Sequence, residues 1–123
     1  MSYRPTTHPH HTTVIMPHAL WQRVEAAADR ELCDYSRVIR AAILGAGEAP
    51  AGVGGVDNRR APTYRHALRL CSACVERIRA ETGGLSKARA LRALVADGLT
   101  RDWRAQLRRA EMGDAWKPEE VRG

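Results

Sequence analysis

Two cysteines separated by two residues, Cys71 and Cys74, form the pair with the clearest chemical potential in this 123-residue chain. A Cys-x-x-Cys pair can supply half of a tetrahedral zinc site, which normally takes four ligands. His66 or Cys33 would have to complete such a site. Both cysteines also fall in an apolar stripe at helical spacing, where buried free thiols are common. We therefore expect no metal, no cofactor and, with three cysteines in all, reduced thiols rather than a disulfide framework.

Residue types used in catalysis are present, but not in the patterns that make them catalytic. The sequence contains no phosphate-binding glycine loop, no nucleophile elbow and no pair of carboxylates at a useful spacing. We therefore expect a protein that is not an enzyme.

Arginines near the C-terminus have a spacing suited to binding phosphates. Arg101, Arg104 and Arg108 share one face of an expected helix, which would follow a nucleic-acid backbone or serve as an ordinary solvated surface. The net charge of +6 also favours an anionic partner. That charge is uneven, because residues 1–50 hold five basic and five acidic side chains, whereas residues 63–123 hold thirteen Lys and Arg against eight Asp and Glu.

The elements that must position these residues form two modules separated by a linker. Residues 45–62 hold five of the ten glycines and two of the six prolines, a composition typical of linkers. No apolar run is long enough to span a membrane, and the first residues do not resemble a signal peptide, so we expect a cytoplasmic protein. The predicted segments are a flexible arm (1–11), an N-terminal module (12–45), the linker (46–62), a helical module (63–112) and a tail (113–123).

The N-terminal module begins with one short strand and continues with two helices. The β-branched run 12–16 is closed by Pro17 and is too short to be stable alone. A helix follows, and Asp34 is suited to cap a second helix that ends at Gly45. The apolar positions expected to form the core are Val14, Met16, Leu20, Trp21, Val24, Val38, Ile39 and Ile43.

This order of elements resembles the ribbon-helix-helix superfamily of DNA-binding proteins, the Arc and MetJ type. The resemblance covers residues 11–45 and rests on the proline after the strand and on the segment Asp34-Tyr35-Ser36-Arg37-Val38-Ile39-Arg40. It implies that two chains pair their strands antiparallel and insert the ribbon into the DNA major groove. The implied base-facing residues are His11, Thr13 and Ile15, and the implied phosphate contacts are Tyr35, Ser36 and Arg37.

The helical module supports two interpretations. An apolar stripe at helical spacing runs from Tyr64 to Ile78 and another from Leu91 to Leu107, which together predict a helical hairpin. Alternatively, residues 86–95 align with 34–43 at a constant offset of 52, and 65–100 would be a degenerate second ribbon-helix-helix copy. Strand pairing at 65–70 would favour the second interpretation.

The predicted fold class is mainly α, with a dimeric ribbon-helix-helix module of one short strand and two helices, followed by a C-terminal helical hairpin. The resemblance implies a sequence-specific protein for double-stranded DNA, a dimeric transcriptional repressor of the phage, plasmid or antitoxin type. It would form a homodimer or higher oligomer, with 63–123 available to a protein partner. The alternatives are an accessory factor for plasmid transfer or partition, and a helical interaction module that binds no DNA.

Overall fold

The strand that opens the N-terminal module pairs with a second strand of the same chain. The computed structural model describes residues 8–47, 63–81 and 87–116. In it, β1 (His10–Pro17) and β2 (Thr63–Leu70) form a two-stranded antiparallel sheet, with His10 opposite Leu70 and Pro17 opposite Thr63. Backbone groups that a lone strand would leave open therefore find partners within one chain.

β2 occupies residues for which the helical stripe predicted a helix, and that prediction was wrong. Leu68 and Leu70 are buried, whereas Ala67 and Arg69 are exposed. This alternation has the period of a strand. The apparent stripe over 64–78 thus combines a strand with the helix that follows it. Because β1 presents an open edge of hydrogen-bonding groups, pairing with it outweighs the weak helical preference of this short segment.

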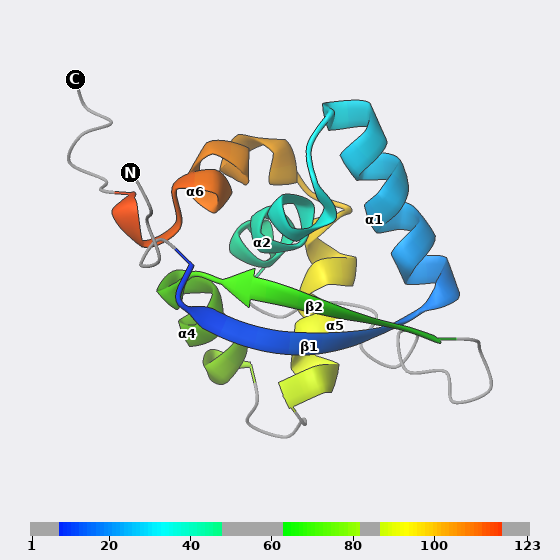
Figure 1. Ribbon diagram of the computed structural model, residues 1–123, viewed down its shortest axis with the longest axis horizontal. Helices are drawn as coiled ribbons and strands as arrows, with labels where there is room; N and C mark the ends of the chain where they lie inside the picture. Colours follow the sequence, from blue (N-terminus) through cyan, green and yellow to red (C-terminus); the bar gives the residue numbers. More distant parts are fainter. Residues whose placement is uncertain (1–7, 48–62, 82–86, 117–123) are drawn as a thin grey trace.

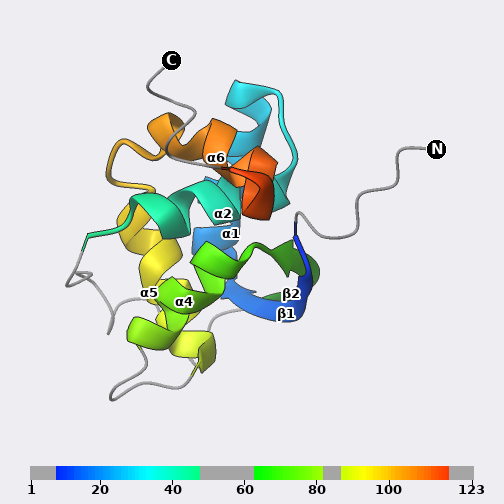
Figure 2. The ribbon, with the colours of Figure 1, turned by 90° about the vertical axis from the view of Figure 1, so that its left-hand side faces the viewer.

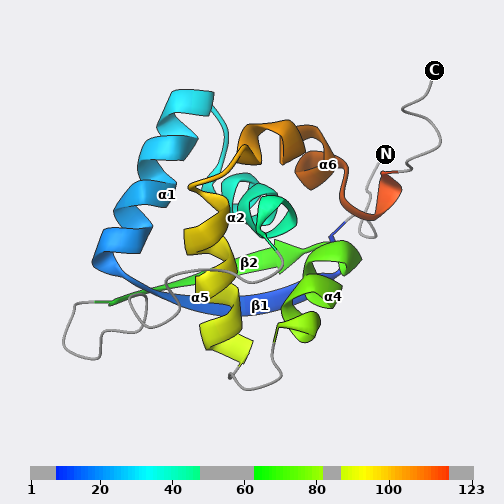
Figure 3. The same ribbon diagram turned by 180° about the vertical axis from the view of Figure 1, so that it is seen from behind.

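Each strand is followed by two helices, so the mainly helical fold class is confirmed. After β1 come α1 (His18–Glu31) and α2 (Tyr35–Gly45), and after β2 come α4 (Ser72–Ala80) and α5 (Lys87–Gly98). Figure 1 shows α2 above the ribbon of strands, and Figure 2 shows the ribbon to the right of the labelled helices. Seen from behind, α5 crosses the ribbon between α1 and α4 (Figure 3).

The two strand–helix–helix segments bury equivalent positions. Val14 and Met16 in β1 have counterparts 54 residues later in Leu68 and Leu70, and all four side chains are buried. In an antiparallel ribbon this correspondence defines an approximate two-fold axis. Thr13 lies opposite Ala67, its own counterpart, so the axis passes through that pair.

One hydrophobic core contains residues from both segments. Met16, Ile39 and Ile43 are fully buried there beside Leu70 and Leu94. The eight apolar positions predicted for the N-terminal module are all buried: Val14, Met16, Leu20, Trp21, Val24, Val38, Ile39 and Ile43. The core is thus built within one chain, although the sequence pattern suggested that two chains would build it.

The second helix begins and ends where the sequence predicted, after Asp34 and at Gly45. The side chain of Asp34 accepts a hydrogen bond from the backbone N–H of Arg37 at 2.8 Å, so it caps α2 as expected. Leu32 ends α1 in the left-handed conformation, with φ of 55°. Ser86, which aligns with Asp34 at the offset of 52, lies outside the described residues.

The long C-terminal helix expected from the second apolar stripe is interrupted. After α5 come η1 (Trp103–Gln106), α6 (Leu107–Met112) and η2 (Gly113–Ala115). The Thr100 hydroxyl donates to the carbonyl oxygen of Asp97 at 2.6 Å, which helps to end α5 just after Gly98. Residues 63–112 therefore do not form a helical hairpin. β2 occupies the start of the first expected helix, and α5, η1 and α6 replace the second.

Both ends of the described chain are more ordered than the sequence indicated. β1 begins at His10, inside the segment expected to be a flexible arm. At the other end, Gly113 is buried and Asp114 accepts hydrogen bonds from the backbone N–H and the hydroxyl of Ser72 at 2.6 and 2.7 Å. The Arg109 guanidinium lies 4.5 Å from the centre of the Trp116 ring. The start of the expected tail therefore packs against α4 and α6.

Among the residues that the structure describes, no helix has the length and apolar character needed to cross a membrane.

Candidate nucleic-acid interface

The face of the ribbon that points away from the core carries six exposed side chains in three cross-strand pairs. We call it the outer ribbon face, and its pairs are His11–Arg69, Thr13–Ala67 and Ile15–Arg65. The family resemblance implied the three β1 members of this face, His11, Thr13 and Ile15. The three β2 members were absent from the predicted site, because a strand at 65–70 belonged only to the alternative interpretation, a second strand–helix–helix copy. The observed pairing of β2 with β1 favours that alternative.

The outer ribbon face is cationic. Arg65 and Arg69 contribute two guanidinium groups, His11 contributes an imidazole, and none of the six residues carries a carboxylate. A guanidinium group presents several N–H donors in a planar arrangement that matches pairs of acceptor atoms. The positive charge that the sequence concentrates in 63–123 thus reaches this face through β2.

Two arginines in equivalent positions connect the helices to the back of the ribbon. Arg40 on α2 donates from Nη1 to the carbonyl oxygen of Arg69 at 3.0 Å, and Arg92 on α5 donates from Nη1 to that of Ile15 at 3.2 Å. The two donors are 52 residues apart, and the two acceptors are 54 residues apart. The approximate two-fold axis therefore relates the two hydrogen bonds, and each half holds the strand of the other.

A second pair of equivalent contacts fixes the ends of the ribbon. His10 Nε2 lies 3.3 Å from Ser72 Oγ, and His18 Nδ1 lies 3.1 Å from Tyr64 Oη. Tyr64 is the counterpart of His10, and Ser72 is the counterpart of His18, each 54 residues later. Each contact joins one strand to the first residue of the helix that follows the other strand. The ribbon is thus restrained at both ends and along its back.

A hollow of about 310 Å³ opens between the start of α2 and the ribbon. It is lined by His8, His11, Ser36, Arg40, Ala67, Leu68 and Arg69. Burial lowers the pKa of His8 below its ordinary value, which favours the neutral imidazole. The guanidinium of Arg40 is buried at the base of this region, where it also donates from Nε to the carbonyl oxygen of Ala110 at 2.8 Å.

Of the three phosphate contacts predicted at the start of α2, only Ser36 lines this hollow. The Tyr35 hydroxyl donates to the carbonyl oxygen of Ala67 at 3.1 Å. Arg37 points to α6, where its Nε donates to the carbonyl oxygen of Leu107 at 3.0 Å and its Nη2 lies 3.6 Å from Glu111 Oε2. Tyr35 and Arg37 therefore make contacts within the protein.

An aromatic cluster packs against the middle of β2, next to the central pair Thr13–Ala67. The rings of Trp21 and His66 stack with centroids 3.7 Å apart, and Tyr35 contacts both at 5.1 and 5.4 Å. These three residues come from α1, β2 and α2. No local spacing in the sequence signals the cluster, because it forms only when the two halves of the chain come together.

The arginines near the C-terminus do not share one helix face. Arg101 precedes η1, Arg104 lies in η1 and Arg108 lies in α6. Arg101 Nε contacts Asp97 Oδ2 at 2.7 Å, and Arg104 Nε contacts Glu31 Oε2 at 2.6 Å. All three arginine side chains are exposed, but they do not lie on one helix, so the single basic helix face predicted from their spacing is not formed.

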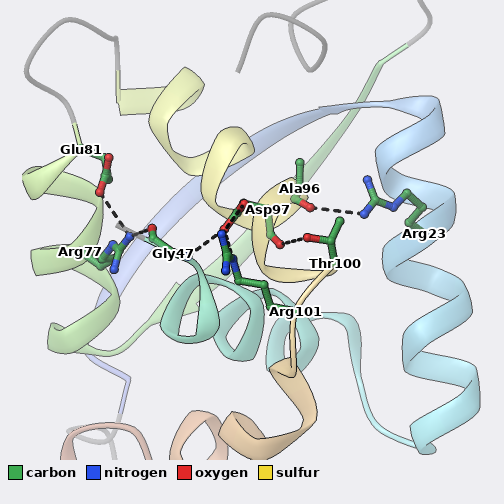
Figure 4. A network of polar contacts seen from close by, with 8 residues as sticks. All are labelled: Arg23, Gly47, Arg77, Glu81, Ala96, Asp97, Thr100 and Arg101. Atoms are coloured by element: carbon green, nitrogen blue, oxygen red, sulfur yellow. Dashed lines mark hydrogen bonds and ion pairs between the residues drawn. The ribbon is translucent and has the colours of Figure 1, made fainter. Parts of the chain in front are cut away.

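Asp97 is the buried centre of a polar network that joins the two halves (Figure 4). Its carboxylate accepts a hydrogen bond from the backbone N–H of Gly47 at 2.7 Å and pairs with Arg101. Arg77 on α4 donates to the carbonyl oxygen of Gly47 and also pairs with Glu81 at 3.2 Å. The network attaches the end of α2 to α4 and α5, so its role in the described structure is to hold the helices in place.

Cys71 and Cys74 lie at the start of α4 and are both buried. Their sulfur atoms are 3.3 Å apart. The Cys71 thiol donates to Cys74 Sγ, and the Cys74 thiol donates to the carbonyl oxygen of Arg40 at 3.8 Å. When Cys71 is ionised, Cys74 becomes the donor between the two sulfur atoms, and this hydrogen bond lowers the pKa of Cys71 to about 6, whereas the same interaction and burial raise the pKa of Cys74. In the described ranges, no group of three or more His, Cys, Asp or Glu side chains is arranged to hold a metal ion.

The chain was compared with protein-family models, curated proteins and solved structures, and nothing matched in any of the three comparisons.

Proposed function

We propose that the protein binds double-stranded DNA in a sequence-specific manner, as a ribbon-helix-helix unit whose two halves belong to one polypeptide. The observation that carries this proposal is the exposed, cationic face of the β1–β2 ribbon, backed by two pairs of helices. A two-stranded ribbon of this kind fits the major groove of B-DNA. The pairing that the family resemblance assigns to two chains takes place here within one.

The side chains of the outer ribbon face suit base edges in the major groove. Arg65 and Arg69 can each donate two hydrogen bonds to O6 and N7 of guanine. Thr13 can donate or accept, His11 can donate, and Ile15 can contact a thymine methyl group. Ser36 lines the hollow at the start of α2. It would bind a backbone phosphate next to the ribbon, as backbone N–H and hydroxyl groups at helix N-termini do.

Transcriptional repression is the role we propose for this binding. A ribbon seated in the major groove of a promoter would compete with other proteins for the same DNA. An accessory role in plasmid transfer or partition would use the same interface, and the identity of the selected DNA distinguishes the two roles.

The first experiment is selection from random duplex DNA, followed by fluorescence anisotropy with the enriched duplex at several salt concentrations. We expect specific binding. The logarithm of the association constant should fall linearly with the logarithm of salt concentration, with a slope of about −0.9 for each phosphate contacted. Arg65→Ala with Arg69→Ala should weaken binding at least tenfold, because each arginine that no longer reaches its base costs about 1–3 kcal/mol. Arg30→Ala serves as the matched control, since Arg30 is exposed near the far end of α1.

Two results would overturn the proposal. One is the absence of binding at low salt, which would leave a helical protein-interaction module as the better description. The other is equal affinity of the double variant and the control, which would exclude the outer ribbon face as the DNA contact.

A further inference from the structure

The two strands of the ribbon are equivalent in backbone and different in their exposed side chains. Across the approximate two-fold axis, His11 corresponds to Arg65, Thr13 to Ala67 and Ile15 to Arg69. No two counterparts on the outer ribbon face are alike. In a ribbon made by two copies of one chain, by contrast, every counterpart would be identical, and the two half-sites on DNA would be identical as well.

The ends of the ribbon consequently present different chemistry. At one end, Arg65 on β2 lies opposite Ile15 on β1, which combines a guanidinium with an apolar side chain. At the other end, Arg69 on β2 lies opposite His11 on β1, which combines a guanidinium with an imidazole. The two arginines share one strand, at positions that the axis does not interchange.

The flanks of the ribbon differ in the same way. Arg92 attaches the α5 side to the Ile15 end of the ribbon, and Arg40 attaches the α2 side to the Arg69 end. The first residue of α5 is the exposed Lys87, and the equivalent first residue of α2 is Tyr35. The Tyr35 hydroxyl donates to a backbone carbonyl group of β2. A cation beside the DNA backbone is thus supplied at the start of α5 but not at that of α2.

We infer that the protein recognises a non-palindromic DNA sequence, in one orientation, with the guanines of the site contacted from β2 and a thymine methyl contacted by Ile15. This inference rests on the proposed function and adds the class of target. Arg65 and Arg69 are its main specificity-determining residues, because each would donate two hydrogen bonds to one guanine.

The test is to derive the selected motif without imposing symmetry and to measure the affinity of the wild-type protein for three duplexes. These are the selected site and two palindromes, each made by repeating one of its halves. We expect the selected site to bind about tenfold or more tightly than either palindrome, because each palindrome places mismatched base pairs under one strand of the ribbon. Arg65→Ala and Arg69→Ala should relax the selection at different positions of the motif.

A symmetrised variant provides the converse measurement. His11→Arg, Thr13→Ala and Ile15→Arg together give β1 the same outer side chains as β2, and all three sites are exposed, so we expect the fold to be retained in circular dichroism. Its selected motif should become palindromic. A palindromic motif for the wild-type protein would overturn this inference alone, whereas failure to enrich any duplex would overturn the proposed function with it.

Discussion

The buried thiols of Cys71 and Cys74 make one residue-level prediction about pH. The pKa of Cys71 is lowered from 9.0 to about 6 by the hydrogen bond from Cys74. Because the folded-state pKa lies below the unfolded one, the stabilisation from the Cys71 thiolate is present above about pH 9. It is lost progressively as the pH falls through 6. We expect thiolate absorbance in the ultraviolet to rise with a midpoint near pH 6.

Cys74→Ala tests the cause of this shift. It removes the hydrogen-bond donor, so the midpoint for Cys71 should move back towards 9.0. Cys33 does not interfere, because its pKa is raised by burial and it titrates at higher pH. A protein whose thiols show no titration below pH 8 would contradict the prediction.

Arg40 and Arg92 allow a matched comparison of two equivalent side chains. Arg40 is buried and donates to two backbone carbonyl groups, those of Arg69 and Ala110. We expect Arg40→Ala to lower the free energy of unfolding by about 2 kcal/mol, because the partly buried Arg69 carbonyl loses the Arg40 donor and the Ala110 carbonyl keeps only His8 Nε2 at 2.8 Å. Burial lowers the pKa of Arg40, and relief of this desolvated charge offsets part of the loss.

Arg92 is more exposed and should matter less. Arg92→Ala is expected to cost about 1 kcal/mol or less, since water can reach the carbonyl group of Ile15 on the ribbon. Urea unfolding monitored by tryptophan fluorescence measures both variants. Equal losses for the two substitutions would show that burial does not determine the strength of these contacts.

At the level of elements, the crossing of α2 and α5 depends on Gly98. A methyl group added there would lie 1.9 Å from the carbonyl oxygen of Ala42, which is backbone and cannot turn aside. We expect Gly98→Ala to destabilise the fold by about 3 kcal/mol or more, because the helices would have to separate. Gly45→Ala is the control, since its added methyl group would meet its nearest neighbour at 3.4 Å and should cost less than about 1 kcal/mol. Thermal unfolding distinguishes the two, and similar midpoints would contradict the close crossing.

The polar network around Asp97 is the other device that joins elements. Asp97→Ala should lower the free energy of unfolding by about 2 kcal/mol, since the N–H of Gly47 loses its buried acceptor. DNA affinity of the folded variant should stay unchanged, because Asp97 lies in the helical layer and not on the outer ribbon face. Weaker DNA binding at a temperature where the variant is fully folded would contradict this separation of roles.

For the whole molecule, pairing of β1 with β2 predicts that a single chain folds. We expect light scattering to give 13.6 kDa, the mass of one chain, and the midpoint of thermal unfolding to be independent of protein concentration. A midpoint that rises with concentration would show instead that strands are exchanged between chains.

The features that sequence reasoning predicted correctly are those with local causes. Pro17 and the alternation around Val14 indicated β1, and Asp34 indicated the start of α2. β2 was mistaken for helix because Leu68 and Leu70 suit a helical stripe as well as a strand, and only the open edge of β1 decides between them. Within the candidate site, the β1 residues followed from the family resemblance, whereas the contacts of Tyr35, Arg37 and Arg101 depend on segments distant in sequence or on the way α5 ends.

Because both strands of the ribbon belong to one polypeptide, the ribbon forms without the association of two chains. When a DNA-binding ribbon is made by two separate chains, the chains must first associate. At low protein concentration, the concentration of the dimer then falls with the square of the monomer concentration. Here the partner strand is always present at a high effective concentration, because it is part of the same chain. With the proposed DNA binding, occupancy of a DNA site should therefore follow a simple hyperbola down to a few molecules per cell, with no threshold set by the association of two chains.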